Sequence, residues 1–324
     1  MRTEEWLESS GLFNALWEGQ WTVPDELLDF EEKYAAFHTP GGRMMSCAHR
    51  GDRNVIYPEN TLEGFESVIR AGADMLEIDL HTTADGEIVI MHDDTLTRMT
   101  DLPMRREAGQ TWMPDTDDIS GWTLEQIKKL RIVRGRNLIT EYAVPTLREV
   151  FALAKGRVFV TLDKIDCFEW GAVEKIISEM DVYREILIPY NYTPARAHEI
   201  QQRQLSAVGK CCPYFAAVGL DGGIMRAELI DSVPVFLSEH GMNPALRGGE
   251  YFPEDTEKLS GVLSKVRGNC RFYAETLKKE HDNEACWEDM RRLGYNIIMG
   301  NKPYEFIKYI CKIENYKYTW RFSK

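Results

Sequence analysis

The sequence has 324 residues, of which 44% are hydrophobic and 28% are charged, a composition typical of a globular protein with a sizeable core. Acidic residues outnumber basic ones by 52 to 39, which gives a formal net charge of −13. Because binding to a phosphate backbone requires a basic surface, this charge argues against a nucleic-acid partner.

The seven cysteines are an odd number, and no two of them form a CxxC pair. This pattern favours free thiols in a cytoplasmic protein over a zinc site or a disulfide framework. The first 14 residues carry acids where a signal peptide needs a basic start, and no run approaches the ~18 apolar residues of a membrane span. We therefore expect a cytoplasmic protein without an integral membrane segment.

Residues 1–42 differ in pattern from the rest and are predicted to form an N-terminal helical extension. Apolar residues recur there at near-helical spacing, namely Trp6, Leu7, Phe13, Leu16 and Trp17. Pro24 opens a second helical run over 24–37. We expect two short helices that pack on the bottom or side of the main domain, 43–324; a lid or a contact between subunits is the alternative.

From residue 43 onward, short apolar runs typical of buried strands alternate with helical patterns. The predicted strands are 44–48, 75–80, 87–91, 157–162, 185–190, 214–220, 233–237, 271–277 and 296–300. The predicted helices are 61–71, 124–130, 147–154, 170–180, 194–203, 255–265, 283–293 and 302–310. This alternation predicts an α/β protein with a parallel sheet, and the number of repeats fits a TIM-type (β/α)8 barrel.

Nine strands are one too many for such a barrel, and the surplus strand is explained by a hairpin. About six residues separate the strand at 75–80 from the strand at 87–91, too few for a parallel crossover. Asp85-Gly86 is a strong two-residue turn, so the pair is predicted to be an antiparallel β-hairpin insertion. In that register Asp79 lies opposite His92. The turn-rich, charged stretch 101–140 then predicts a long excursion over the barrel mouth that covers the substrate.

The residues around this hairpin suit one kind of chemistry. Glu77 and Asp79 are two positions apart on a strand and share a face, and their oxygen ligands suit Mg²⁺ or Ca²⁺ rather than zinc. His49 and His92 offer a general acid and a general base near neutral pH. Arg50 offers a bidentate fork for a phosphate or a carboxylate. Together these groups indicate metal-assisted phosphoryl transfer.

The ordered set of motifs also resembles the glycerophosphodiester phosphodiesterase family. The matching residues are His49-Arg50-Gly51, Pro58-Glu59-Asn60-Thr61, Gly72-Ala73-Asp74, Glu77-x-Asp79, Asp85-Gly86, His92-Asp93 and Arg98-x-Thr100. Looser likeness continues through 119–130, Pro145-Thr146-Leu147, Leu162-Asp163-Lys164 and Asn301-x-Pro303, so it covers about residues 43–311.

The resemblance implies a TIM-type barrel, one divalent cation, and hydrolysis of a glycerophosphodiester to glycerol 3-phosphate and an alcohol. It implies that the substrate's 2-hydroxyl attacks phosphorus and that water then opens the cyclic phosphate. It makes His49 and His92 the acid/base pair and Arg50 a phosphate contact. It also makes Glu77 and Asp79 metal ligands and Glu59 a supporting residue at or behind the metal.

The chain departs from the family pattern at two strand ends. Where the family has Glu-x-Lys, this chain has Asp163-Lys164; we assign Asp163 to the metal, and Lys164 to the phosphate through a bend at the strand end. Where the last strand of the family ends in Asp, this chain has Asn301.

Three alternatives to the family activity are compatible with this sequence. The first is release of a head group from a lysolipid, and the second is a reaction that stops at a cyclic phosphate. The third is a barrel that only binds a phosphodiester. The sequence does not specify the alcohol, the cation or the oligomeric state.

Overall fold

A computed structural model describes residues 21–39, 41–53, 55–135, 138–164, 170–189, 194–217, 220–221, 224–225, 245–250, 271–317 and 319–320. The predicted helix within residues 1–20, the strand at 233–237 and the helix at 255–265 lie outside these ranges. No helix within the described ranges is long and apolar enough to cross a bilayer. The division into an extension, 1–42, and a barrel domain, 43–324, stays a prediction.

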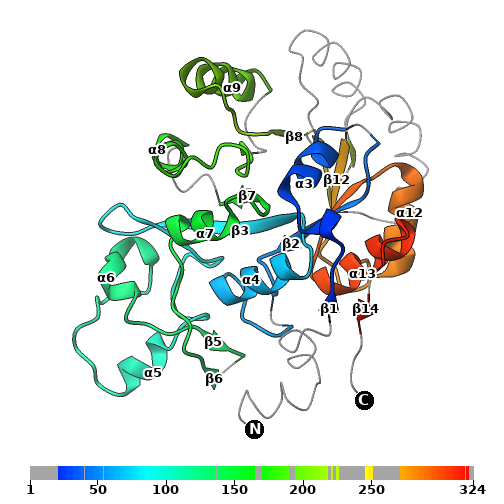
Figure 1. The fold of residues 1–324 in the computed structure, drawn as a ribbon. Coiled ribbons are helices and arrows are strands. Elements are labelled where there is room, and N and C mark those ends of the chain that lie inside the picture. The colour runs from blue at the N-terminus through cyan, green and yellow to red at the C-terminus, as the bar shows by residue number, and fades with distance from the viewer. Residues whose placement is uncertain are drawn as a thin grey trace.

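Parallel strands form the centre of the molecule (Figure 1). They are β2 (Met45–His49), β3 (Met75–Thr82), β7 (Phe159–Asp163), β8 (Phe215–Ala217), β11 (Ala245–Glu250), β12 (Arg271–Thr276) and β13 (Ile297–Gly300). Their order is β7-β3-β2-β13-β12-β11-β8. Two parallel bridges, Val160 to Ile186 and Ile188 to Tyr214, insert residues 186–188 between β7 and β8 and close the circle. The predicted barrel is therefore confirmed.

Helices cover the outside of the barrel. They are α4 (Leu62–Arg70), α7 (Leu147–Ala154), α8 (Trp170–Met180), α9 (Pro194–Val208), α12 (Glu284–Leu293) and α13 (Pro303–Ile313). Local sequence fixes several of their starts: Thr146 and Glu149 form a capping box at α7, and Asn283 caps α12. The strand β11 was not predicted, because its sequence, ALRGGE, is rich in glycine and has no β-branched residue. Two short strands, β9 (Leu220–Asp221) and β10 (Ile224–Met225), pair with each other.

Alternate residues of β2, β3, β7, β12 and β13 face the two sides of the barrel wall. Outward residues such as Leu76 and Ile298 join the core shared with the helices. The inward residues form a second core near the amino ends of the strands; they are Met45, Cys47, Met75, Phe159, Leu187, Tyr273, Ile297 and Met299. This alternation decides which polar residues face inward further along each strand.

The second predicted helix packs on the floor of the barrel. The run at 24–37 is split into a 3-10 turn, η1 (Asp25–Leu27), and the helix α3 (Phe30–Phe37), because Asp29 caps α3 by accepting from the backbone N–H of Glu31. The rings of Phe30 and Phe37 lie 5.2 and 5.0 Å from that of Phe159. Just before this helix, β1 (Trp21–Thr22) pairs with β14 (Thr319–Trp320), so the first and last described segments lie side by side (Figure 1).

The hairpin is confirmed, but its predicted register is wrong by one residue. β3 pairs antiparallel with β4 (Ile88–Ile90), with Leu80 opposite Ile90. The Met91 N–H donates to the carbonyl of Asp79, so Met91, not His92, lies opposite Asp79. The turn has three residues, 84–86, rather than two, and Gly86 adopts the positive φ of +81° that such a loop requires.

The stretch 101–140 is a folded insertion rather than a loose excursion. It contains α5 (Leu102–Glu107), η2 (Ile119–Gly121), α6 (Leu124–Ile127), β5 (Val133–Arg134) and β6 (Leu138–Ile139). Around Trp122 it builds a core of its own, which also takes in Val89 and Met91 from the hairpin. The many charged residues of this stretch conceal that apolar pattern in the sequence. Whether the insertion covers a substrate stays a prediction.

Candidate active site

The polar residues of the site continue the inward-facing series of the strands. On β2 the inward series is Met45, Cys47 and His49; on β3 it is Met75, Glu77 and Asp79; on β7 it is Phe159, Thr161 and Asp163. The apolar members form the floor of the barrel, and the polar members lie at the carboxyl ends of the strands. Active sites of this fold lie at that end.

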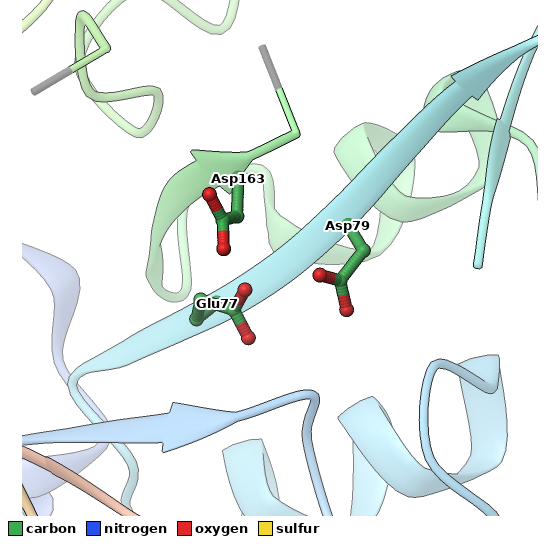
Figure 2. A group of neighbouring side chains, drawn as sticks. All are labelled: Glu77, Asp79 and Asp163. Atoms are coloured by element: carbon green, nitrogen blue, oxygen red, sulfur yellow. The ribbon is translucent and has the colours of Figure 1, made fainter. Parts of the chain in front are cut away.

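Three carboxylates meet in one space. Figure 2 shows Glu77 and Asp79 on one face of β3, with the carboxylate of Asp163 turned toward them from the end of β7. Register pairs Asp79 with Asp163. Each of the three offers one oxygen that lies within 4.8 Å of the others. The predicted ligands therefore converge.

This cluster has the features of a cation site. Glu77 and Asp79 are 4% and 0% exposed. Glu77 Oε1 and Asp79 Oδ1 are buried and have no hydrogen-bond partner among the described residues. Burial and the neighbouring charges of Asp79 and Asp163 raise the pKa of Glu77 well above its usual value. A hard divalent cation would satisfy the buried oxygens and offset this repulsion, so the residues present fit Mg²⁺ or Ca²⁺.

The loop after β2 holds Arg50 against the cluster. Arg50 adopts a φ of +57°, and its backbone N–H donates to Glu77 Oε2 at 2.9 Å. Its Nε lies 3.3 Å from Asp79 Oδ2, and its Nη1 lies 3.4 Å from Glu59 Oε1. Glu59 thus contacts Arg50 directly. Asn60, also at positive φ, donates from its amide to Asp79 Oδ2.

His49 is buried beside the cluster and oriented by Asn301. Its Nδ1 lies 2.8 Å from Asn301 Oδ1, while Asn301 Nδ2 donates to the carbonyl of Leu277. The guanidinium of Arg53 also reaches this nitrogen, with Nη1 2.5 Å from His49 Nδ1. Nε2 lies 3.9 Å from Glu77 Oε2. Burial, then the charges of Arg53 and Arg50, lower the pKa of His49 to about 3, so its ring is neutral at pH 7.

His92 lies two residues beyond β4, where the chain bends away from the hairpin. Its ring is one-third exposed, and Nδ1 lies 2.7 Å from Asp93 Oδ1. The charge of His92 contributes to the pKa of both His49 and Asp79. The two imidazoles and the carboxylate cluster therefore lie within electrostatic reach of one another at the same end of the barrel, although the cross-strand pairing used to predict this is wrong.

Lys164 makes the bend that its assignment requires. Its φ of +61° departs from the strand, and its backbone N–H donates to Asp163 Oδ1. Its Nζ lies 3.9 Å from Asp94 Oδ1. His81 reaches the same carboxylate, with Nε2 3.7 Å from Asp94 Oδ1. The lysine side chain therefore lies beside the loop that follows β4.

Several residues that had no role in the sequence-based prediction take part in this network. Arg53 donates to Asn301 Oδ1, Asn60 holds Asp79, and Arg98 bonds to both Asp93 and Glu59. Asn60 and Arg98 belong to the motifs shared with the family, so the sequence did mark these two positions. Arg53 follows the HRG motif without belonging to it, so only the folded loop shows its contact.

Asp52 supports the loop that carries Arg50. It is fully buried, and its Oδ1 accepts from the N–H groups of Ile56 and Tyr57. Its Oδ2 accepts from the hydroxyl of Tyr304 at 2.5 Å. Burial raises its pKa from 3.8 to about 6 despite these bonds.

The substitution Asp52→Asn should flatten the dependence of stability on pH. Between about pH 4 and 6 the folded protein binds a proton that the unfolded chain has lost, so the free energy of unfolding falls as pH rises through this window. A shift of this size corresponds to a loss of about 3 kcal/mol, complete above pH 6. Urea unfolding from pH 4 to 7 measures the difference between wild type and variant. Asp181→Asn, at an exposed aspartate, serves as the control; equal slopes for wild type and Asp52→Asn would contradict this assignment.

Comparison with known proteins supports the class that the fold and the site define, a TIM-type barrel with a polar site at the carboxyl ends of its strands. Residues 49–206 match the model of the glycerophosphoryl diester phosphodiesterase family. A protein of Bacillus subtilis, named as the uncharacterized protein YqiK, is 33% identical over 231 residues, which are 68% of this chain and 83% of that protein. The chain belongs to the glycerophosphodiester phosphodiesterase family.

Relatives with a named activity align over shorter regions. A glycerophosphodiester phosphodiesterase of Caldanaerobacter subterraneus is 34% identical over 163 residues, 48% of this chain and 61% of the relative. The bovine glycerophosphodiester phosphodiesterase 1 is 36% identical over 116 residues, 35% of this chain and 31% of the relative. The alignments thus span less than two thirds of these relatives.

Solved structures show the same fold. A glycerophosphoryl diester phosphodiesterase from Parabacteroides distasonis superposes with a TM-score of 0.65 at 22% identity, covering 88% of this chain and 92% of that one. An Oleispira antarctica phosphodiesterase in complex with the product sn-glycerol-3-phosphate superposes with a TM-score of 0.55 at 18% identity, covering 83% and 97%.

Proposed function

We propose that this protein hydrolyses glycerophosphodiesters to glycerol 3-phosphate and an alcohol. The observation that carries the proposal is the convergence of three carboxylates and two imidazoles at one end of a barrel of this family. The named activity of the relatives and the product bound to the Oleispira antarctica phosphodiesterase support it.

We propose that Glu77, Asp79 and Asp163 hold one divalent cation, Mg²⁺ or Ca²⁺. All three are oxygen donors, and two of them have buried oxygens without a partner among the described residues. When bound, such a cation supplies positive charge that stabilises the charge developing on the phosphoryl oxygens.

His49 fits the base of the first step and His92 the acid. His49 is neutral and its Nε2 lies beside the cluster, so we assign this nitrogen to take the proton of the substrate's 2-hydroxyl as that oxygen bonds to phosphorus. The bond from phosphorus to the alcohol breaks, and His92, oriented through Nδ1 by Asp93, gives its Nε2 proton to the departing oxygen. Water then opens the cyclic phosphate with the two roles reversed.

Arg50 and Lys164 are proposed to bind the phosphate. Arg50 faces the carboxylate cluster, and Lys164 lies at its hairpin side. The guanidinium can donate two parallel hydrogen bonds, whereas the ammonium acts as a point charge. Glu59 is proposed as a supporting residue, because it contacts Arg50 and Arg98.

A product assay tests this proposal. Wild-type protein with Mg²⁺ or Ca²⁺ is incubated with glycerophosphocholine and, separately, with lysophosphatidylcholine, and ³¹P NMR identifies the products. Glycerol 3-phosphate from the first substrate supports the proposal. Lysophosphatidic acid from the second substrate alone, or a cyclic phosphate that accumulates, would instead support the lysolipid or the cyclising reaction. No turnover with either cation would contradict the proposal and support the third alternative, a barrel that binds a phosphodiester without cleaving it.

A further inference from the structure

Arg98 belongs to the turn that links the hairpin to the insertion, and the insertion fixes the backbone of this turn. Leu96 and Met99, on either side, are buried in the core of the insertion. Thr95 forms a bridge to Asp118, and Thr97 Oγ1 donates to Asp117 Oδ2 at 2.6 Å. The insertion therefore holds Arg98 in place from behind.

The guanidinium of Arg98 joins two carboxylates that serve different parts of the site. Its Nε lies 2.5 Å from Asp93 Oδ2, and its Nη2 lies 2.8 Å from Asp93 Oδ1. The same Nη2 lies 2.7 Å from Glu59 Oε1. Asp93 is the residue that orients His92, and Glu59 is the residue beside Arg50. One side chain thus connects the proposed acid to the proposed phosphate-binding arginine.

We propose that Arg98 is a positioning residue that sets His92 and Arg50 in a fixed relation by holding Asp93 and Glu59 on one guanidinium. This inference rests on the proposed function. It also gives the insertion a role: its core supports the turn from which Arg98 reaches the site.

Without Arg98, neither Asp93 nor Glu59 would be held in its present position. Asp93 is one-quarter exposed, so without Arg98 it can rotate away from His92. Glu59 is 4% exposed, and without Arg98 its remaining ion pair among the described residues would be the longer contact to Arg50. Hydrogen bonds from Arg98 lower the pKa of Asp93, which keeps its carboxylate ionised and able to orient an imidazole. A lysine can neutralise charge here, but it lacks the planar fork that engages both carboxylates.

The substitution Arg98→Ala should lower kcat by about 10–100-fold, the usual effect of removing a partner that orients a functional side chain, while KM changes less than about threefold. Arg98→Lys should recover part of this loss. Arg148→Ala is a matched control, because Arg148 is similarly exposed (44% against 48% for Arg98) and forms a 2.5 Å ion pair, with Glu179, away from the site. Thermal unfolding of each variant separates loss of positioning from loss of the fold.

A double-mutant cycle decides whether Arg98 acts through Asp93. In the wild-type background, Arg98→Ala should lower kcat by the full factor given above. In an Asp93→Asn background the loss of kcat should be several-fold smaller, because the carboxylate through which Arg98 acts is gone. Equal costs in both backgrounds would overturn the proposal. A rise in KM with unchanged kcat would also overturn it and make Arg98 a direct phosphate contact.

A crystal structure of Arg98→Ala gives a readout independent of turnover. We expect the His92 ring to leave Asp93; an unchanged ring would refute the positioning role even if the wild-type protein proved inactive on glycerophosphodiesters. An inactive wild type with a displaced ring in the variant would contradict only the proposed function.

Discussion

Replacing His92 with alanine should reduce kcat by about 10²–10⁴-fold, the range for removal of a general acid or base. The ring is one-third exposed and, within the described ranges, its one side-chain hydrogen bond is to Asp93, so its loss should affect chemistry more than folding. Steady-state kinetics on the substrate identified by ³¹P NMR measures the effect. KM should change little, because the proposed phosphate contacts belong to Arg50 and Lys164.

Two comparisons make this result specific to His92. His198→Gln changes a histidine on the outer helix α9 and should leave kcat within about twofold, as expected for a side chain away from the chemistry. A substrate with a more acidic leaving alcohol, such as a p-nitrophenyl ester, needs less protonation and should recover much of the activity of His92→Ala. Equal losses on both substrates would mean that His92 does not act as the acid.

The inward-facing residues of the site could be predicted because side chains alternate between the two faces of a strand, and this alternation depends only on neighbouring residues. Once Glu77 and Asp79 are placed on one strand, a period of two puts them on one face, and no long-range information is needed. The same rule leaves Lys164 on the wrong side of β7. In the structure the backbone turns at Lys164 with a positive φ, which the sequence does not signal for a lysine; its role at the phosphate stays a prediction.

Contacts that depend on a turn or on a distant segment could not be predicted. The hairpin register followed from a two-residue turn, and the third turn residue shifted it by one. One partner of the His49 ring is Asn301, which follows it by more than 250 positions. The link from Arg98 to Glu59 exists only because the insertion has a core of its own, which its charged sequence conceals.

A divalent cation should raise the stability of the wild-type protein. A ligand that binds only the folded state at 100 times its dissociation constant stabilises that state by about 2.7 kcal/mol. We expect thermal unfolding of the protein to shift upward on titration with Mg²⁺ or Ca²⁺ and to return on chelation. Glu77→Gln should abolish most of this shift and lower kcat at a fixed cation concentration, because the amide supplies no charge to the site.

Without a bound cation, Glu77→Gln should be more stable than wild type. The raised pKa of Glu77 means that its ionised form is disfavoured in the fold, so at neutral pH the carboxylate costs stability above its unfolded pKa. The substitution Glu77→Gln removes this charge, while the amide oxygen of the new side chain can still accept from the Arg50 N–H. Glu77→Gln should therefore unfold at a higher temperature than wild type in chelator and at a lower temperature in saturating cation. Glu63→Gln, on the outer helix α4, should show no such crossing; a variant that is less stable than wild type under both conditions would mean that Glu77 is a structural carboxylate rather than a ligand.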